Sequence, residues 1–224
     1  YDYNPKWFEG NMFKTNWLKP VIGTSDCNWG LLDGINQDGL AISLTFGGKN
    51  ASAQGFGIPL IMRYILETCT KTSDAINCLK RIPSHMSYNI TIIDKQGDYK
   101  TVYLFPGKAP FVNSERVATN HQQAVEWPAY EASTLTRERK QFLDNVVNIP
   151  GISRDDVRDK FLWQPLYNQD ITKHFVTLYG VQYDVEELSA TYFWPYKSMQ
   201  QSFQNFNEER ISVDINVKSP VLVS

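Results

Sequence analysis

The stretch "GLLDGINQDGLAISLTF" (residues 30–46) decides the fold class of this chain. Its centre, Asn-Gln-Asp-Gly, is a turn that can supply the positive φ of a tight hairpin. The flanking segments "GLLDGI" and "GLAISLTF" are rich in apolar residues, which is typical of strands beside such a turn. The stretch therefore predicts an antiparallel hairpin and a protein that contains antiparallel sheet.

Helical patterns follow this hairpin in two blocks. Residues 58–82 carry apolar side chains at helical spacing and predict two consecutive helices, with Thr72 or Ser73 as the cap of the second. Residues 133–148 predict an amphipathic helix, and residues 153–162 repeat the pattern with a serine at the start. We expect these helices to cover the faces of antiparallel sheets.

Strand patterns separate and follow the two helical blocks. Residues 88–107 predict a second hairpin, 116–120 a short strand and 175–193 a last hairpin. The order strands, two helices, strands, two helices, strands indicates a layered α+β domain. The chain has neither GxGxxG nor GxxxxGK[ST], so we predict no nucleotide site and no cofactor.

Composition and charge exclude several classes of partner. The chain has 224 residues, is 42% hydrophobic and shows no linker or repeat, which predicts a single domain over 1–224. A net charge of -2 with scattered basic residues argues against nucleic acid. The longest apolar stretch, 55–66, contains Arg63 and falls short of the roughly 18 residues of a membrane span, so we predict no span.

Three cysteines raise the question of a nucleophile. Cys27, Cys69 and Cys78 are too few and too irregularly spaced for a disulfide framework or a zinc site, and we predict no metal. An odd count favours free thiols in a reducing compartment such as the cytoplasm, although the compartment stays open. Cys27 could be read as the nucleophile of an amide-cleaving enzyme, but we expect a partly buried structural thiol there and core positions for the other two.

Six segments occur in an order that resembles a known family. They are "YDY" (1–3), "LLDGINQDGLAISLTFGG" (31–48), "IPLIMRYILETC" (58–69), "SYNITIIDKQG" (87–97), "VATNH" (117–121) and "STLTRERKQFL" (133–143). The series is similar to that of the N-terminal-nucleophile cysteine amide hydrolases, in the isopenicillin N acyltransferase-like and choloylglycine hydrolase-like branches. This resemblance implies a four-layer αββα sandwich with two antiparallel sheets.

The same resemblance implies an activity. Such proteins hydrolyse, or transfer the acyl group of, a linear non-peptide amide through a cysteine thioester, so the expected partner is a small-molecule amide. Their nucleophile is an N-terminal cysteine whose own α-amine, with a pKa of about 7.7–8.0, serves as the base. The family's Arg-Asn-x-Asp motif fits here only with Tyr1 as x and Asp2 as Asp. The resemblance therefore places the nucleophile upstream of residue 1, in a removed segment or a companion N-terminal chain.

Four catalytic candidates follow from the matched motifs. Asp2 would hold the α-amine, and Asn120 would donate an N–H to the oxyanion of the tetrahedral intermediate, with an Asx turn as the alternative. Thr45 falls where bile-salt-type relatives place a second polar oxyanion residue, usually Asn, and the backbone there could still donate. Arg137 matches an arginine near the nucleophile, although Arg139 is one register away and an exposed helix position remains the alternative.

Aromatic and glycine residues are the candidates for substrate binding. Phe46, Gly47, Trp127 and Tyr130 would line or edge an apolar acyl site, with ordinary core or inter-subunit packing as the alternative for the aromatics. Glycine turns at 47–48 and 55–57 would let backbone approach substrate closely. A catalytically inactive relative that binds a small acylated ligand, a structural subunit of a processed heterodimer and a homo-oligomer all remain open.

Overall fold

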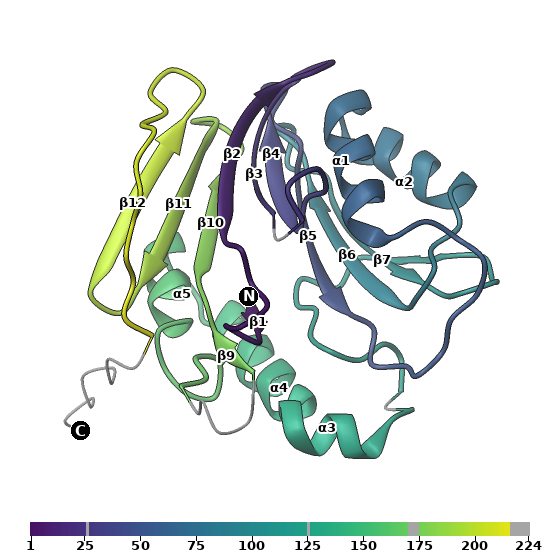
Figure 1. Ribbon diagram of the computed structural model, residues 1–224. Coiled ribbons are helices and arrows are strands. Elements are labelled where there is room, and N and C mark those ends of the chain that lie inside the picture. The colour runs from purple at the N-terminus through teal and green to yellow at the C-terminus, as the bar shows by residue number, and fades with distance from the viewer. Residues whose placement is uncertain (26, 125, 170–174, 216–224) are drawn as a thin grey trace.

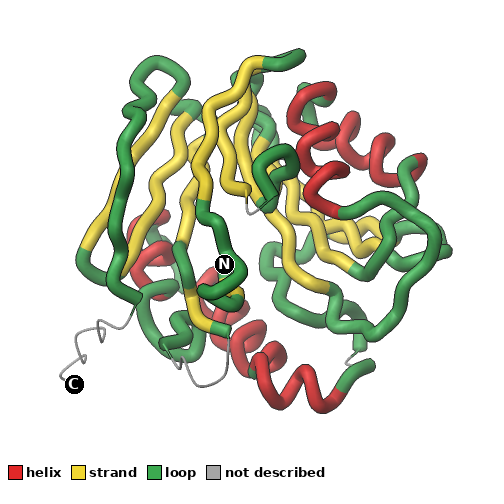
Figure 2. The backbone as a smooth tube through the Cα atoms, in the orientation of Figure 1, coloured by secondary structure: helices red, strands yellow, loops and turns green. Residues whose placement is uncertain are grey.

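The computed structural model describes residues 1–215, except 26, 125 and 170–174. It is an α+β sandwich in which two helices cover one face of a large sheet, a second β layer packs on the other face, and three further helices lie at one end (Figure 1). Figure 2 shows the two β layers face to face, with the first two helices outside the larger one. The predicted fold class is confirmed.

The larger layer is a seven-stranded antiparallel sheet in the order β2-β3-β4-β5-β6-β7-β8. The opening hairpin is confirmed as β4 and β5, which pair through Ile35 and Ala41 around Gly39 at φ +84°. The predicted second hairpin is β6 and β7. The strands are β2 (Asn11–Asn16), β3 (Pro20–Ser25), β4 (Asp33–Asn36), β5 (Ala41–Phe46), β6 (Tyr88–Ile93), β7 (Tyr99–Leu104) and β8 (Phe111–Asn113).

Two helices cover one face of this sheet, as predicted. They are α1 (Ile58–Thr68) and α2 (Thr72–Arg81), and their apolar side chains form one buried core with those of β3, β5, β6 and β7. The predicted caps are wrong, because α2 begins after Lys71 and no side chain caps it. Thr72 instead donates its N–H to Asp94 Oδ2 at 2.9 Å and its hydroxyl to the Asp98 carbonyl at 2.8 Å. These bonds attach α2 to the β6–β7 turn.

The second β layer packs against the other face. It contains the antiparallel strands β10 (Gly180–Asp184), β11 (Ser189–Trp194) and β12 (Lys197–Ser202), and beside them β1 (Asp2–Tyr3) paired with β9 (Val176–Thr177). The second predicted sheet is thus divided into a three-stranded sheet and a two-stranded pair. Ile22, Ile35 and Ala41 from the larger sheet share a buried core with Tyr192 and Trp194 from this layer.

The remaining helices gather at the end of the molecule where β1 and β9 lie (Figure 1). They are α3 (Pro128–Thr134), α4 (Thr136–Val147) and α5 (Arg154–Lys160). The single helix predicted over 133–148 is broken at Leu135, whose φ of +51° is left-handed. The predicted start of α5 is confirmed, because Ser153 and Asp156 form a reciprocal capping box. Within the described ranges, no helix is long and apolar enough to cross a membrane.

The strand predicted over 116–120 is wrong. The structure has only an isolated bridge there, between Thr119 and His121. A β-branched composition favours a strand, but the carbonyls of this segment bond to side chains instead of to a neighbouring strand. The segment is therefore a bend whose position depends on a few polar side chains.

Candidate functional site

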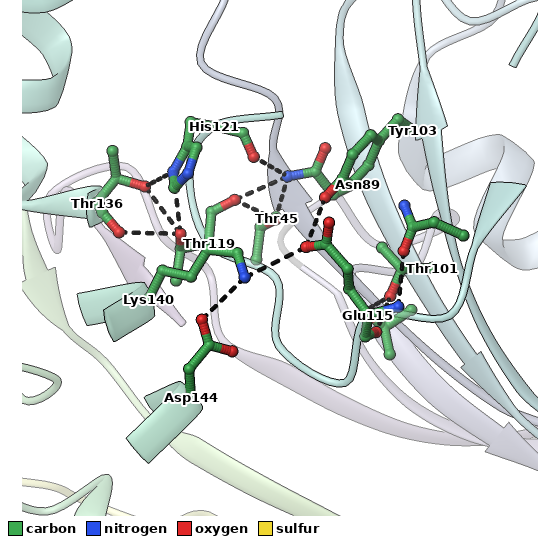
Figure 3. A network of polar contacts seen from close by, with 12 residues as sticks. Thr45, Asn89, Thr101, Tyr103, Glu115, Thr119, His121, Thr136, Lys140 and Asp144 are labelled. Carbon is green, nitrogen blue, oxygen red and sulfur yellow. Dashed lines mark hydrogen bonds and ion pairs between the residues drawn. The ribbon is translucent and has the colours of Figure 1, made fainter. Parts of the chain in front are cut away.

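The bend at 119–121 is held from the sheet by one amide. Asn89 on β6 lies opposite Thr45 on β5, and its Nδ2 donates to Thr119 O at 2.7 Å and to His121 O at 3.0 Å (Figure 3). Thr45 Oγ1 donates to the same Thr119 carbonyl at 3.0 Å. Both peptide carbonyls that flank Asn120 are therefore fixed by side chains of the sheet.

The first turn of α4 holds the same bend from the other side. Thr119 Oγ1 donates to Thr136 O at 3.0 Å, and Thr136 Oγ1 lies 2.9 Å from His121 Nδ1 (Figure 3). Burial, with the charges of Lys140 and Arg137, lowers the pKa of His121, which favours the neutral ring beside the Thr136 hydroxyl. His121 thus contacts α4 and acts as a packing residue there.

Asn120 extends to an aromatic cluster. Its Nδ2 donates to the Tyr130 hydroxyl at 3.3 Å. The Tyr130 ring lies 5.3 Å from that of Phe46 in an edge-on arrangement and 5.3 Å from that of Trp127 in a stacked one. Burial raises the pKa of Tyr130 to about 12, so this hydroxyl stays protonated. The three aromatic residues predicted from the sequence and Asn120 are therefore brought together.

An ion pair lies beside this cluster. Arg139 Nη1 is 3.0 Å from Asp2 Oδ2, and Thr177 Oγ1 donates to Asp2 Oδ1 at 2.7 Å. Both charged side chains are about four-fifths buried, with 19% and 20% exposed. Arg139 lies three residues after Thr136 on α4, and Thr136 O accepts from Thr119 in the bend that carries Asn120, so the start of this helix links the ion pair to the bend. Asp2 and Asn120 thus belong to one region of the molecule.

Arg137 lies elsewhere. Its side chain is 68% exposed, and its ion-pair contact is with Glu131 at 3.9 Å. Of the two arginines that the motif left open, Arg139 is the one that contacts Asp2. The break at Leu135 bears on which arginine contacts Asp2. Because α4 begins anew after this residue, the helical spacing before the break does not determine which face of α4 points to Asp2.

The predicted glycine turns and Thr45 have defined places. Gly48 has φ +69°, and a Cβ on it would lie 2.3 Å from Asn120 O, so only glycine fits against the bend. Gly47 is buried beside Ser87 and donates its N–H to the Ser87 carbonyl at 2.9 Å. The other glycine turn, at 55–57, packs instead on the chain around Ser84. The Thr45 hydroxyl donates its hydrogen to Thr119 O, so Thr45 positions the bend.

The three cysteines occupy other positions. Cys27 is partly buried just beyond β3, with its N–H donated to Ser25 Oγ at 3.1 Å and its Sγ near Gly30. Cys69 and Cys78 are buried in the core formed with α1 and α2, as predicted. Among the described residues, no group of three or more His, Cys, Asp and Glu side chains is placed to hold a metal ion.

Asn89 is a residue of this region that sequence reasoning missed. Only 1% of it is exposed, and its amide connects β6 to the bend. Its signal was present in "YNITII" (88–93), where an amide side chain stands in an otherwise β-branched and aromatic strand. Buried side-chain amides form hydrogen bonds, so an amide in such a strand indicates a possible anchor for a neighbouring segment.

Solved structures share this fold at low sequence identity. Penicillin V acylase from Agrobacterium tumefaciens is 14% identical, with a TM-score of 0.50 over 91% of this chain and 77% of the other. An N-acylethanolamine-hydrolyzing acid amidase ortholog from Caenorhabditis elegans is 10% identical, with a TM-score of 0.57 over 86% and 85%. A mutant conjugated bile acid hydrolase from Clostridium perfringens is 11% identical, with a TM-score of 0.52 over 84% and 78%. These likenesses identify an N-terminal-nucleophile hydrolase fold.

The family comparison covers most of the sequence. No curated protein matches the chain. The family described as acyl-coenzyme A:6-aminopenicillanic acid acyl-transferase matches residues 1–198 of the 224. Asp2, the bend at 119–121 and Arg139 all fall within the matched range. The chain therefore belongs to the acyl-coenzyme A:6-aminopenicillanic acid acyl-transferase family, within the N-terminal-nucleophile hydrolases.

Proposed function

We propose that this chain carries most of the active site of an enzyme that cleaves a linear non-peptide amide, or transfers its acyl group, through a cysteine thioester. The observation that carries the proposal is the Asp2–Arg139 pair beside the Asn120–Tyr130 contact. It combines a carboxylate that could hold an α-amine with an amide that could donate to an oxyanion. An N-terminal nucleophile needs both groups, and it needs no histidine base.

The first step would form the thioester. The α-amine takes the thiol proton, and the sulfur attacks the amide carbonyl to give a tetrahedral oxyanion. Asn120 has two amide hydrogens and gives one to Tyr130 at the long distance of 3.3 Å, so its N–H groups can serve the more strongly accepting oxyanion. Collapse of the intermediate breaks the C–N bond, and the leaving amine takes the proton from the α-ammonium group.

The second step would return the enzyme to its starting state. Water, or an amine in the acyltransferase case, attacks the thioester carbonyl and gives up a proton to the α-amine. The C–S bond breaks, the departing cysteine sulfur takes that proton from the α-ammonium group, and an acid or a new amide is released. Asp2 would orient the α-amine throughout, and Arg139 would hold the Asp2 carboxylate in place.

The nucleophile of this proposal is a cysteine that precedes Tyr1 in the complete protein. Support comes from the positions of the three cysteines in the chain. Cys27 bonds with Ser25 beyond the end of β3, whereas Asp2 bonds with Thr177 and Arg139. Cys69 and Cys78 lie under the outer helices, in a core formed on the other face of the large sheet.

The proposed substrate has an apolar acyl group. Phe46, Trp127 and Tyr130 are half-buried side by side next to Asn120, and such a surface suits an aromatic or aliphatic acyl chain. The relatives of known structure are named for acylated substrates, namely penicillin V, conjugated bile acids and N-acylethanolamines. We extend to this chain only the shared class, an acyl group on a non-peptide amide.

A thiol-directed experiment tests this proposal. The complete protein would be assayed for amine release from phenoxyacetyl, fatty-acyl and bile-acyl amides, and then treated with an acyl-mimicking electrophile. We expect turnover of at least one amide and a stoichiometric adduct on an N-terminal cysteine. The Cys27→Ala variant should keep both, because Cys27 bonds only near the end of β3. An adduct on Cys27 that accompanies loss of turnover would contradict the assignment of the nucleophile.

A further inference from the structure

Two buried thiols touch each other under the outer helices. Cys69 follows the last turn of α1, Cys78 lies in the last turns of α2, and their Sγ atoms are 3.4 Å apart. Only 2% and 6% of the two residues are exposed. A disulfide bond needs about 2.05 Å between sulfurs, so small side-chain rotations that close a gap of about 1.4 Å would join them.

The two thiols have different surroundings. Burial, together with the contact with Cys78, raises the pKa of Cys69 to about 12, so Cys69 stays protonated. Cys78 Sγ accepts a hydrogen bond from the Arg81 guanidinium Nη2 at 3.7 Å, so a positive charge lies beside it. Leu79 and Arg81 also line a surface cavity of about 390 Å³. Through its contact with Arg81, Cys78 is linked to the wall of this cavity.

We propose that Cys69 and Cys78 form a reversible intrachain disulfide that links α1 to α2. It is a modification site of the outer helical layer, separate from the amide-cleaving chemistry proposed above. The charge beside Cys78, the contact between the sulfurs and the nearby cavity carry the proposal together.

The exchange balances with a small disulfide such as oxidised glutathione as the oxidant. The Cys78 thiolate attacks one glutathione sulfur, forms a mixed disulfide and releases one glutathione thiolate. Cys69 then attacks the Cys78 sulfur, and its proton goes to the second glutathione as that leaves. The protein loses two protons and two electrons, and one oxidised glutathione takes them up to become two reduced molecules.

The bond would stabilise the fold without touching the candidate site. α1 and α2 pack on one face of the seven-stranded sheet, and their shared core contains both cysteines. Asp2 and the second β layer belong to the opposite side. Closing this short loop restricts the unfolded chain, and we expect Tm to rise by roughly 5–10 °C. Turnover at moderate temperature should stay the same.

The test uses the Cys27→Ser variant of the complete protein, with any upstream cysteine first capped by an acyl-mimicking electrophile. The protein is incubated with oxidised glutathione, quenched in acid, denatured and alkylated, and then analysed by mass spectrometry. We expect a mass lower by two hydrogens, no alkylation of the pair and a peptide that links the segments of Cys69 and Cys78. Dithiothreitol should reverse all three results. Tm should rise when the disulfide forms and fall again when it is reduced.

Single-cysteine variants provide the matched control. Cys69→Ala keeps Cys78 beside Arg81, so this variant should stop at the mixed disulfide with glutathione. Two results with the intact pair would overturn the proposal. One is full alkylation of both thiols after long incubation with the oxidant. The other is a stable glutathione adduct on Cys78, which would mean that the sulfurs cannot close.

Discussion

The two faces of the seven-stranded sheet are packed in different ways. The face under α1 and α2 is covered by apolar residues of the two helices, such as Ile61 and Leu66, which are 1% and 0% exposed. The face toward the second β layer combines an apolar core with a buried carboxylate, Asp33. Tyr179 donates its hydroxyl to Asp33 Oδ2 at 2.6 Å, and Tyr183 donates to Oδ1.

The two faces therefore differ in role: one mainly stabilises the fold, and the other mainly fixes the position of β1. Apolar contacts are non-directional, so those of the helix face stabilise the fold without fixing any one atom, and the buried Arg63–Glu67 pair of α1 binds the β2–β3 segment. Hydrogen bonds are directional, and Tyr179 is both a partner of Asp33 and the residue whose carbonyl bonds the Tyr1 backbone nitrogen at 2.7 Å. The inter-sheet face thus places β1, and with it Asp2. Five predictions test this division.

The largest expected effect is a loss of stability on the helix face. Leu66→Ala removes a fully buried side chain and should lower the free energy of unfolding by about 2–5 kcal/mol. Leu60→Ala, on the same helix but 41% exposed, should cost far less. Urea unfolding of both variants measures this, and kcat of the folded protein should stay the same. A large fall in kcat for Leu66→Ala would contradict the division.

The next effect falls on catalysis alone. Asn120→Ala in the complete enzyme should lower kcat by about 10²–10³ with little change in KM, because the oxyanion contact forms fully only in the transition state. The midpoint of unfolding should move little, since the Asn120 side chain is half-buried and makes one long hydrogen bond. Steady-state kinetics with an accepted amide would decide, and normal turnover would remove Asn120 from the site.

Much of the fold could be predicted because hydrophobic periodicity records burial directly. Apolar residues recur with the spacing of a strand or a helix in three segments that the structure confirms. These are the hairpin at 30–46, the helices over 58–82 and the hairpin at 88–107. The sequence analysis missed β2 and β3 (11–25), where half-exposed β2 at the sheet edge shows little alternation. It also missed the short β8 and the polar β12.

The candidate site was less predictable because it depends on contacts between distant segments. The bend at 119–121 has a strand-like composition, and contacts with Asn89 and Thr45, thirty or more residues away along the chain, hold it as a bend. The left-handed Leu135 has no sequence signal, yet it divides the predicted helix and decides which arginine contacts Asp2. The order of the motifs identified the candidate residues, but their relative positions could be known only from the folded structure.

The third prediction concerns the amide that holds the bend. Asn89→Asp would place a carboxylate oxygen against the carbonyls of Thr119 and His121, where two acceptors repel. We expect kcat to fall by about 10- to 100-fold, because Asn120 would lose its fixed position. Asn120→Ala in the same background should then cost less than it does alone, since the two act together. Fully additive losses would show that Asn89 does not act through Asn120.

The fourth prediction is a pH dependence from the inter-sheet face. Burial raises the pKa of Asp33, against the hydrogen bonds of Tyr179 and Tyr183, which lower it. The folded state therefore binds this proton more tightly than the unfolded state, so stability should fall as pH rises from the ordinary range of Asp toward the raised value. One proton limits the slope to about 1.4 kcal/mol per pH unit. Asp33→Asn should remove this component of the pH profile, measured by urea unfolding, and an unchanged profile would rule out Asp33 as its source.

The smallest expected effect distinguishes the two arginines. Arg139 contacts Asp2 at 3.0 Å with four-fifths of its side chain buried, whereas Arg137 is 68% exposed and 3.9 Å from Glu131. Partly buried ion pairs contribute modestly, so Arg139→Ala should lower kcat/KM by about three- to tenfold, and Arg137→Ala should leave it unchanged. Arg139→Lys keeps the charge but shortens the reach and loses the planar fork, so it should recover part of the loss. If Arg139 acted only by packing, Arg139→Met would retain kcat/KM as well as Lys does. A loss in Arg137→Ala that equals the loss in Arg139→Ala would instead show that α4 contributes a general positive field, without a specific contact to Asp2.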